Sequence, residues 1–352
     1  MGKKALQLFG TLVIICSLIP FATANYWWIR GFDFPHLQLT FLTLLTIFIL
    51  LLKYDLKDKK DSLIIGLLFI CFAIQVIKIF PYTSLAKVEI ADSTKSSSDR
   101  DIKVYTANVL QSNDQYELVI EQIRKHEPDL LLLLETTLGW QKAIEKELPD
   151  TYRFSQTVPQ ENTYGMLLYS KLPLLDPITR NLVSDTIPSI HCKVLLNATD
   201  TLQVFAIHPT PPMPTHNPMS TDRDAEMMKV AIASMKSDLP VIVMGDFNDV
   251  AWSRTTSLFE EVSGLLDLRK GRGLYNTYNA TNIIMRWPLD HLFVSEHFLL
   301  HSIARGEKIN SDHFPVIAHL EYDPQVADKQ RMEPPSDDDL HQATEIAARV
   351  SN

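Results

Sequence analysis

Residues that can bind metal ions or transfer protons stand at the ends of several short apolar segments of the sequence. Each segment is rich in aliphatic or β-branched residues and is interpreted as a β-strand. At a strand end a buried sheet meets solvent, so a ligand can reach the polar side chain. The positions are Asn108, Glu135, His208, Asp246, Asn248, Asp290, Asp312 and His313.

Each of these positions also has a purely structural interpretation. A carboxylate or asparagine at a strand end often caps a turn or a helix, and a single histidine is often only a hydrogen-bonded structural residue. Asp249 is interpreted in this way, as a helix cap. A series of such positions, each in the same place relative to its strand, favours one shared site instead.

The ordered motifs resemble those of the endonuclease/exonuclease/phosphatase superfamily, and Gly-Asp-Phe-Asn and Ser-Asp-His-Phe-Pro are specific to it. The resemblance spans roughly residues 101–323 and implies a four-layer α/β sandwich, with two packed, mainly antiparallel sheets flanked by helices. It also implies Mg²⁺-dependent phosphoester hydrolysis, as in DNase I-like nucleases, sphingomyelinases and inositol-phosphate phosphatases. The motifs are Asn108, Glu135, His208, Gly245-Asp246-Phe247-Asn248, Leu289-Asp290 and Ser311-Asp312-His313-Phe314-Pro315.

The resemblance assigns a metal ion to three of these residues. Glu135 is the principal ligand, and Asn108 and Asp312 contribute directly or through water. Mg²⁺ prefers oxygen ligands and is usually held by one or two carboxylates. Mn²⁺ is the alternative ion.

The resemblance gives catalytic roles to five residues. Asp246 orients or deprotonates the attacking water, and Asn248 donates a hydrogen bond to the developing negative charge. His208 and His313 contact the scissile phosphate, with His313 held by Asp290 in a carboxylate–histidine pair. Which residue is the acid and which the base stays open.

The neighbours of these motifs give weaker predictions. Arg286 and His291 are candidates for substrate binding because they lie beside Asp290, although His291 could also be a strand residue that faces solvent. Trp287 could meet a substrate head group together with Arg286. The stiff segment Pro209-Thr210-Pro211-Pro212 is expected to shape one wall of the site.

Three apolar stretches near the N-terminus are long enough to cross a bilayer as helices, at residues 5–24, 36–52 and 63–80. Tyr26, Trp27 and Trp28 stand where an aromatic belt would lie. Two alternatives stay open. Ala22-Thr23-Ala24 resembles a signal-peptide cleavage site, and the stretch 63–80 could be a buried core helix of the soluble part.

Basic residues predict the orientation of these spans. Lys3 and Lys4 precede the first, and four lysines crowd the loop between the second and third, whereas Arg30 is alone in the first loop. The positive-inside rule then places the N-terminus in the cytoplasm and the C-terminal domain on the extracytoplasmic side, in a periplasm or at the cell surface.

The remaining boundaries follow from composition. Residues 1–82 form the membrane anchor, residues 83–100 a polar, serine-rich flexible linker, residues 101–323 the catalytic domain, and residues 324–352 a mostly disordered acidic tail that could end in a short helix. Within the catalytic domain, helices are expected at 116–126 and 222–236. Strands are expected at 102–107, 130–134, 166–169, 202–207, 241–244, 289–294 and 315–320.

Charge and cysteine content narrow the function. The net charge is −9, and most of the acidic excess falls in the catalytic domain, which lacks the basic face that a DNA-binding surface normally shows. The three cysteines have neither disulfide-framework nor zinc spacing. Nucleic acid is therefore a less favoured partner, and no feature indicates an obligate protein partner.

Three functions remain in view. The first is a phosphoesterase at the extracytoplasmic face of the membrane, with the bilayer as partner and a lipid-linked or other phosphate ester or anhydride as substrate. A membrane anchor would confine the site near lipid headgroups, which favours the lipid-linked substrate. The second is a Mg²⁺-dependent nuclease that acts on extracytoplasmic nucleic acid. The third is a catalytically silent scaffold, which the full set of motif residues disfavours.

Overall fold

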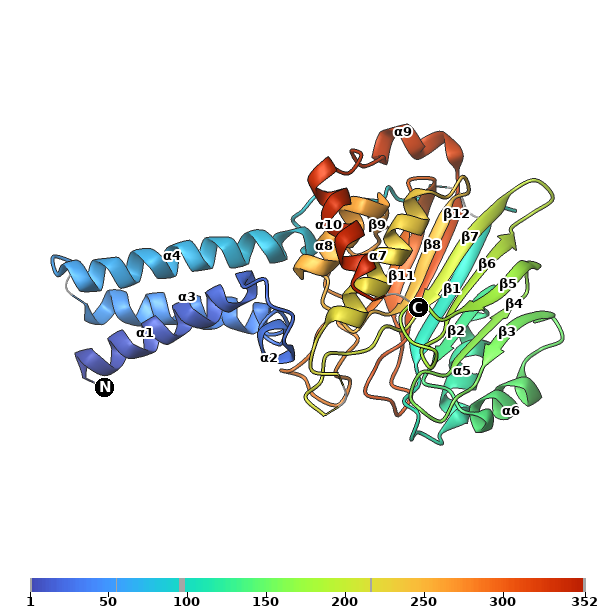
Figure 1. Cartoon of the computed structure of the whole chain (residues 1–352), viewed down its shortest axis with the longest axis horizontal. Helices are drawn as coiled ribbons and strands as arrows, with labels where there is room; N and C mark the ends of the chain where they lie inside the picture. The colour runs from blue at the N-terminus through green and yellow to red at the C-terminus, as the bar shows by residue number, and fades with distance from the viewer. Residues whose placement is uncertain (1, 55, 95–98, 216, 351–352) are drawn as a thin grey trace.

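Three long N-terminal helices form a bundle that projects from a sandwich of two β-sheets (Figure 1). This is a computed structural model, and it describes residues 2–54, 56–94, 99–215 and 217–350. The sandwich contains the motif residues, and the bundle meets it through loops at one end.

The bundle consists of α1 (Lys3–Leu18), α3 (His36–Lys53) and α4 (Lys59–Ile79). With their flanking turns, these helices give three candidate membrane spans, Lys3–Phe21, His36–Lys53 and Lys59–Tyr82. Their apolar side chains point outward as well as inward, which is typical of helices in lipid. The short helix α2 (Trp27–Arg30) lies in the connection between α1 and α3.

Helix α4 does not belong to the core of the sandwich, so the alternative interpretation of residues 63–80 is wrong. Its buried residues Ile65, Leu68 and Cys71 pack with residues of α1 and α3. Its outer face leaves Ile70 and Ile77 exposed. The helix is apolar all round because it lies in a bundle suited to a bilayer.

The first sheet has six strands in the order β11-β12-β1-β2-β4-β3, and only β1 and β2 run parallel. Its central strand β2 consists of five leucines, all buried, because both faces of the strand are covered. The strands are β1 (Asp101–Asn108), β2 (Leu130–Leu134), β3 (Phe154–Val158), β4 (Met166–Ser170), β11 (Phe298–Arg305) and β12 (Val316–Tyr322).

The second sheet also has six strands, in the order β5-β6-β7-β8-β10-β9, and only β7 and β8 run parallel. Alternate side chains of the two sheets meet in one shared apolar core. The strands are β5 (Leu174–Arg180), β6 (Ser189–Leu195), β7 (Thr201–Ile207), β8 (Val241–Asp246), β9 (Leu266–Asp267) and β10 (Asp290–Val294).

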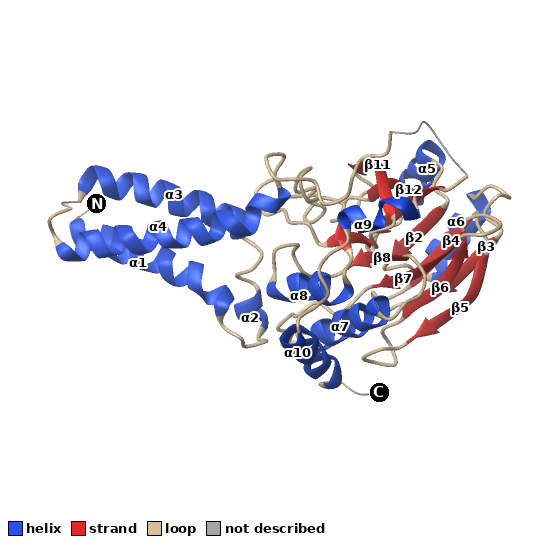
Figure 2. Cartoon of the chain, turned by 90° about the horizontal axis from the view of Figure 1, so that it is seen from above, coloured by secondary structure: helices blue, strands red, loops and turns tan. Residues whose placement is uncertain are grey.

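Helices cover the outer faces of both sheets and complete a four-layer α/β sandwich, as expected from the sequence (Figure 2). On the second sheet, α8 begins at a Ser253 cap, whose hydroxyl accepts from the Thr256 amide, and ends at Gly264 in the left-handed conformation. The helices are α5 (Tyr116–His126) and α6 (Leu138–Glu147) on the first sheet, and α7 (Thr221–Met235), α8 (Arg254–Ser263) and α10 (Asp337–Ala348) on the second.

The C-terminal tail is not mostly disordered, contrary to the expectation from its acidic composition. Helix α10 lies against α7 and α8, and its Ala343 and Ile346 join their apolar core. The short helix α9 (Ala327–Gln330) precedes it. Burial of one apolar stripe stabilises a segment whose average composition indicates disorder.

The segment between anchor and sandwich is also more ordered than a flexible linker. Ile90 is fully buried in the shared core, and the Glu89 carboxylate accepts from the Asp267 amide. The Ser93 amide donates to the Leu300 carbonyl beside β11. The serine-rich residues 95–98 of the expected linker lie outside the described residues.

Glu226 on α7 makes folding sensitive to pH. It is fully buried, and neither carboxylate oxygen has a hydrogen-bond partner among the described residues. Burial raises the pKa of this carboxyl from 4.5 to about 8. The folded chain therefore keeps a proton on Glu226 that the unfolded chain loses. The contribution of this proton to the free energy of unfolding is fully present below the ordinary pKa of 4.5 and is lost as the pH rises through about 8.

Replacing Glu226 by Gln should leave the melting temperature unchanged at about pH 5 and raise it by roughly 5 °C or more at about pH 9. Thermal unfolding of the full chain in detergent, followed by circular dichroism, measures both values. Glu121→Gln on the exposed face of α5 is the matched control. An equal shift at both pH values would show that the buried charge is not the cause.

Candidate active site

The strand order brings the motif residues to one edge of the sandwich. Each sheet has one parallel pair, so the carboxyl ends of β1 and β2 lie together, as do those of β7 and β8. The antiparallel neighbours β12 and β10 begin at the same edge, where Asp290 is paired with Asp246. Residues that lie far apart in the sequence therefore converge between the two sheets.

Asn108, Glu135 and Asp246 form the first part of the site. The Asn108 amide nitrogen donates to Glu135 Oε1 at 2.8 Å and to Asp246 Oδ2 at 3.0 Å. The other Glu135 oxygen accepts from the Gln111 amide at 3.2 Å. Two carboxylates from different sheets are thus held within reach of one side chain.

The backbone at these positions is unusual for strand ends. Glu135 has a positive φ of 59°, a conformation that costs energy for a residue other than glycine and often marks a functional site. Gly245 precedes Asp246 with a φ of 145°, and a Cβ there would lie 1.9 Å from the Ile207 carbonyl oxygen. Only glycine allows β8 to approach β7 this closely, so Gly245 fixes where Asp246 points.

Two histidines approach Asp246 from either side. His313 Nε2 lies 3.6 Å and His208 Nε2 lies 3.8 Å from Asp246 Oδ2. His313 Nδ1 is bonded to Asp290 Oδ2 at 2.7 Å, so the expected carboxylate–histidine pair is present. The second oxygen of Asp290 and Nδ1 of His208 have no hydrogen-bond partner among the described residues, although both are buried.

Burial and neighbouring charges shift the acidity of these groups in opposite directions. Burial alone would lower the pKa of His313, but Asp290 and Asp246 outweigh it and raise the pKa to about 10. Burial lowers the pKa of His208, and Asp246 only partly offsets it. His313 is therefore suited to hold a proton, and His208 to be neutral.

Two of the acidic residues of the site, Glu135 and Asp246, have raised pKa values. Burial raises the pKa of Glu135 and of Asp246, and the neighbouring carboxylates of Asp312 and Asp290, respectively, raise them further. Close carboxylates at a buried edge repel one another, so a bound cation would stabilise their charged forms.

Asn248 is held in place from two sides. Its own amide N–H donates to Asp246 Oδ1 at 2.9 Å, and its side-chain nitrogen donates to the Pro209 carbonyl at the same distance. The Asn248 carbonyl accepts from the buried Arg223. Asp249 is not the helix cap that was expected, because Ser253 caps α8. Asp249 instead forms an ion pair with Arg223 and accepts from the Ser253 hydroxyl, which holds this loop in place.

A pocket of about 520 Å³ lies at this edge, between the two sheets and the anchor. Within the described parts of the chain, three carboxylates line it, from Glu135, Asp246 and Asp312, and no lysine or arginine does. His208, Asn248 and His313 line it too, as do Pro211 and Pro212 of the stiff segment that was expected to form a wall. We call this cavity the site pocket.

The donors of the site pocket fit a divalent cation that prefers oxygen ligands. A phosphate group entering beside three carboxylates would be repelled unless a cation neutralised that charge. Glu135 and Asp312 both present carboxylates to the site pocket, although each oxygen of Glu135 already accepts one hydrogen bond. Asn108 turns its amide nitrogen toward Glu135 and its oxygen toward the Leu110 amide. Binding through Asn108 Oδ1 would require this amide to turn over.

A second set of possible metal ligands includes Asp246 and His313 of the site pocket and Asp290, which lies behind His313. One ligand atom each from Asp246, Asp290 and His313 lies within 4.8 Å of the others. These three were assigned catalytic roles from the sequence. His313 Nδ1 and Asp290 Oδ2 are already hydrogen-bonded to each other at 2.7 Å. This contact favours a carboxylate–histidine pair over a metal site at these three residues.

Two residues expected to bind substrate do not reach the site pocket. His291 is fully buried on the opposite face of β10 from Asp290, where its Nε2 donates to the Asp249 carbonyl and its Nδ1 accepts from Arg269. Neighbouring residues of a strand face opposite sides of the sheet, so only one of the pair can face the site. His291 also does not face solvent.

Arg286 is turned away as well. Its guanidinium lies 5.0 Å from the centre of the Phe314 ring, and its Nε donates to the Asn279 carbonyl. Its neighbour Trp287, considered together with it from the sequence, does line the site pocket.

The membrane anchor contributes to the site pocket, which was not expected from the sequence. Residues 22–35, which connect α1 to α3 and are called the anchor loop below, place Trp27, Gly31, Phe34 and Pro35 along one wall. The Phe34 ring meets Trp287 edge-on at 5.6 Å, and the Asp33 carbonyl accepts from Trp252 Nε1. Tyr26-Trp27-Trp28 was the available signal, but it was interpreted only as an aromatic belt.

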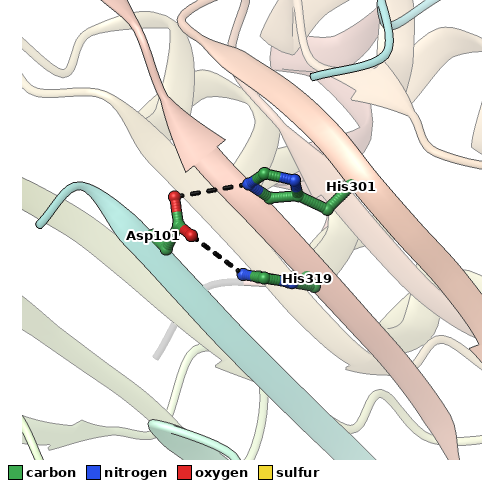
Figure 3. A group of neighbouring side chains, drawn as sticks. All are labelled: Asp101, His301 and His319. Atoms are coloured by element: carbon green, nitrogen blue, oxygen red, sulfur yellow. Dashed lines mark hydrogen bonds and ion pairs between the residues drawn. The ribbon is translucent and has the colours of Figure 1, made fainter. Parts of the chain in front are cut away.

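A separate polar cluster lies outside the site pocket. Asp101 of β1 interacts through its two oxygens with Nε2 of His301 at 3.3 Å and of His319 at 3.2 Å (Figure 3). A β-bulge between Leu300 and Ser302 makes His301 the extra residue of β11, beside His319 of β12. The carboxylate thus links three adjacent strands.

Asp290 should act by positioning His313. Asp290→Asn is expected to lower the turnover rate about 10- to 100-fold, the usual cost of removing the carboxylate that orients a functional histidine. It should also move the pH limb of His313 to lower pH, because the charge that raises the pKa of His313 is lost. A pH–rate profile checks both, and an unchanged limb would show that Asp290 has only a structural role.

Comparisons with known proteins agree with this geometry. The Endonuclease/Exonuclease/phosphatase family pattern matches residues 105–313, which is more than half of the chain. No curated protein matches the chain.

Three solved structures have similar folds. An endonuclease/exonuclease/phosphatase from Bacteroides vulgatus is 20% identical with a TM-score of 0.51, covering 63% of this chain and 99% of its own. The human Nocturnin catalytic domain with bound sulfate anion is 16% identical with a TM-score of 0.50, covering 63% and 95%. D. rerio TDP2 complexed with single strand DNA product is 13% identical with a TM-score of 0.50, covering 63% and 99%.

At these identities the solved structures establish the fold alone, while the family match covers the strands and motifs that build the site pocket. The chain therefore belongs to the endonuclease/exonuclease/phosphatase family of metal-dependent phosphoester hydrolases.

Proposed function

We propose that this protein is a Mg²⁺-dependent phosphoesterase that hydrolyses a lipid-linked phosphate at the extracytoplasmic face of its membrane. The observation that carries the proposal is the composition of the site pocket. Its catalytic groups stand on one side, and an apolar wall from the membrane anchor stands on the other.

The negative charge of the site pocket supports a site that binds one phosphate group together with a cation. Glu135 and Asp312, with Asn108 after rotation of its amide, would hold Mg²⁺, which would neutralise charge on the phosphate oxygens. A longer polyanion would need further cations along its path, and no lysine or arginine of the described residues lines this pocket.

The chain's own residues account for the proton transfers. Asp246, next to both imidazoles, would accept a proton from the attacking water. His313, whose pKa is raised by Asp290 and Asp246 against the effect of burial, would carry a proton to the leaving oxygen or hold a phosphate oxygen. Asn248, fixed by Asp246 and Pro209, would donate its remaining amide hydrogen to the developing charge.

The apolar wall supports a lipid-linked substrate. Trp27 and Phe34 come from the anchor loop, and Met285 and Trp287 come from the catalytic domain. Such a wall offers little to a nucleotide sugar or a sugar phosphate but suits the hydrocarbon next to a lipid headgroup. The lysines around the N-terminus and between α3 and α4 favour the cytoplasm for those ends and the opposite side for the site pocket.

A phosphate-release screen of the full chain in detergent micelles tests the proposal, with phospholipids, polyprenyl phosphates, nucleotides and nucleic acids as substrates. We expect Mg²⁺-dependent release from lipid phosphates that EDTA abolishes. Plasmid and single-stranded DNA form the second arm, because TDP2 of similar fold is known with a single strand DNA product. Robust, Glu135-dependent DNA cleavage without lipid turnover would establish the nuclease instead.

A further inference from the structure

The loop of residues 279–286 connects the site pocket with the first turn of α3. At its base, Tyr278 and Trp287 pair through their backbones and both line the site pocket. Near its tip, the amides of Ile284 and Met285 both donate to the Asn282 side chain at 2.9 Å, so the tip is a formed turn. We call this segment the 279–286 loop.

The tip of this loop is apolar and exposed. Ile283 is 86% exposed, Ile284 73% and Met285 46%, and residues 279–285 contain no charged side chain. A contiguous exposed apolar patch is unusual on a water-facing surface and marks a protein or membrane contact.

The loop is tied directly to a candidate membrane span. Gln38, in the first turn of α3, donates its side-chain amide to the Ile284 carbonyl. If α3 crosses the bilayer, its first turn lies at the bilayer surface, and the 279–286 loop must lie at the same level. Trp27 and Trp28 of the anchor loop are also partly exposed there, as expected for aromatic residues at an interface.

We propose that the tip of the 279–286 loop is inserted into the outer leaflet and that this loop and the anchor loop form a lateral entrance to the site pocket. A lipid phosphate would pass its headgroup between Met285 of the 279–286 loop and Trp27 of the anchor loop, beside the packed rings of Phe34 and Trp287. Its hydrocarbon chain would stay in the leaflet. This inference rests on the proposed lipid-linked substrate, while insertion of the loop can be tested without it.

The first experiment measures insertion and needs no activity. Ile284→Cys, labelled with an environment-sensitive fluorophore in full chain reconstituted into phosphatidylcholine vesicles, should show a blue-shifted emission that nitroxide-labelled lipids quench. Leu138→Cys on α6 is the matched control, since Leu138 is 50% exposed but lies on a helix of the first sheet, away from the bundle. The unsubstituted chain, treated with the same fluorophore, gives the background signal from its own three cysteines. Equal quenching at both positions, or none at Ile284→Cys, would overturn the insertion.

The second experiment measures entry. Changing Ile283 and Ile284 together to Ser should lower kcat/KM at least roughly 10-fold for phosphatidic acid or polyprenyl pyrophosphate embedded in the vesicles. Hydrolysis of water-soluble bis(p-nitrophenyl) phosphate should be unchanged, since neither isoleucine lines the site pocket. Equal loss on both kinds of substrate would overturn the entrance. If the unsubstituted chain hydrolyses only the soluble ester, the lipid-linked substrate fails, and the quenching result still decides where the loop lies.

Discussion

Replacing Asp246 by Asn should reduce phosphoester hydrolysis by roughly 10²–10⁴-fold while leaving the fold intact. Asparagine keeps the size of the side chain but cannot accept a proton, and it removes the negative charge that both His208 and His313 face. The Asn108 amide would also meet a second amide in place of a carboxylate oxygen. Steady-state rates with the substrate found by the release screen measure the loss.

Asp238→Asn is the matched control for this prediction. Asp238 is exposed and lies in the turn that leads into β8, the strand that ends at Asp246. The control should keep full activity and the same melting temperature. An Asp246→Asn protein that is folded and retains more than about a tenth of the activity would remove Asp246 from the chemistry.

Replacing Glu135 by Gln should raise the Mg²⁺ concentration needed for half-maximal activity and lower the maximal rate about 10²-fold or more. Glutamine can still accept from the Gln111 amide, so the strained turn after β2 should persist. What is lost is one of three carboxylates that line the site pocket, and with it a negatively charged oxygen ligand for a divalent ion.

Titration calorimetry with Mg²⁺ gives a readout of this change that does not depend on turnover. Glu121→Gln on α5 controls for loss of one acidic charge at the surface. Unchanged Mg²⁺ affinity in Glu135→Gln would exclude Glu135 as a ligand and would favour the alternative set of Asp246, Asp290 and His313.

The anchor loop is bound to the catalytic domain and lines the site pocket. The Trp27 amide donates to the Pro218 carbonyl, and the Asn25 carbonyl accepts from Ser220, next to α7. Together with the contact between Asp33 and Trp252, these bonds dock the loop on the catalytic domain. The anchor is therefore part of the wall of the site pocket, and tests of substrate specificity should use the full chain.

The sequence by itself determined the strands and motifs at the centre of the sandwich. Residues such as Leu130–Leu134 are apolar throughout because both sides of the strand are covered, so local composition is sufficient to predict the strand. The motif residues stand at the ends of such strands, and their order indicated one shared site. The three apolar spans were equally clear, since crossing a bilayer requires about 20 apolar residues.

Only the tertiary structure decided which side chains face the site pocket and what else surrounds it. The edge strand β5 is mostly exposed, and its mixed composition carries no strand signal. Asp290 and His291 are adjacent, but the direction of β10 turns one toward the site pocket and the other into the helix layer. Helix α10 is ordered by its contacts with α7, and the anchor loop by its contacts with Trp252 and Trp287. These partners are distant in sequence. Local pattern cannot reveal such contacts, because their free energy comes from surfaces that meet only after the chain has folded.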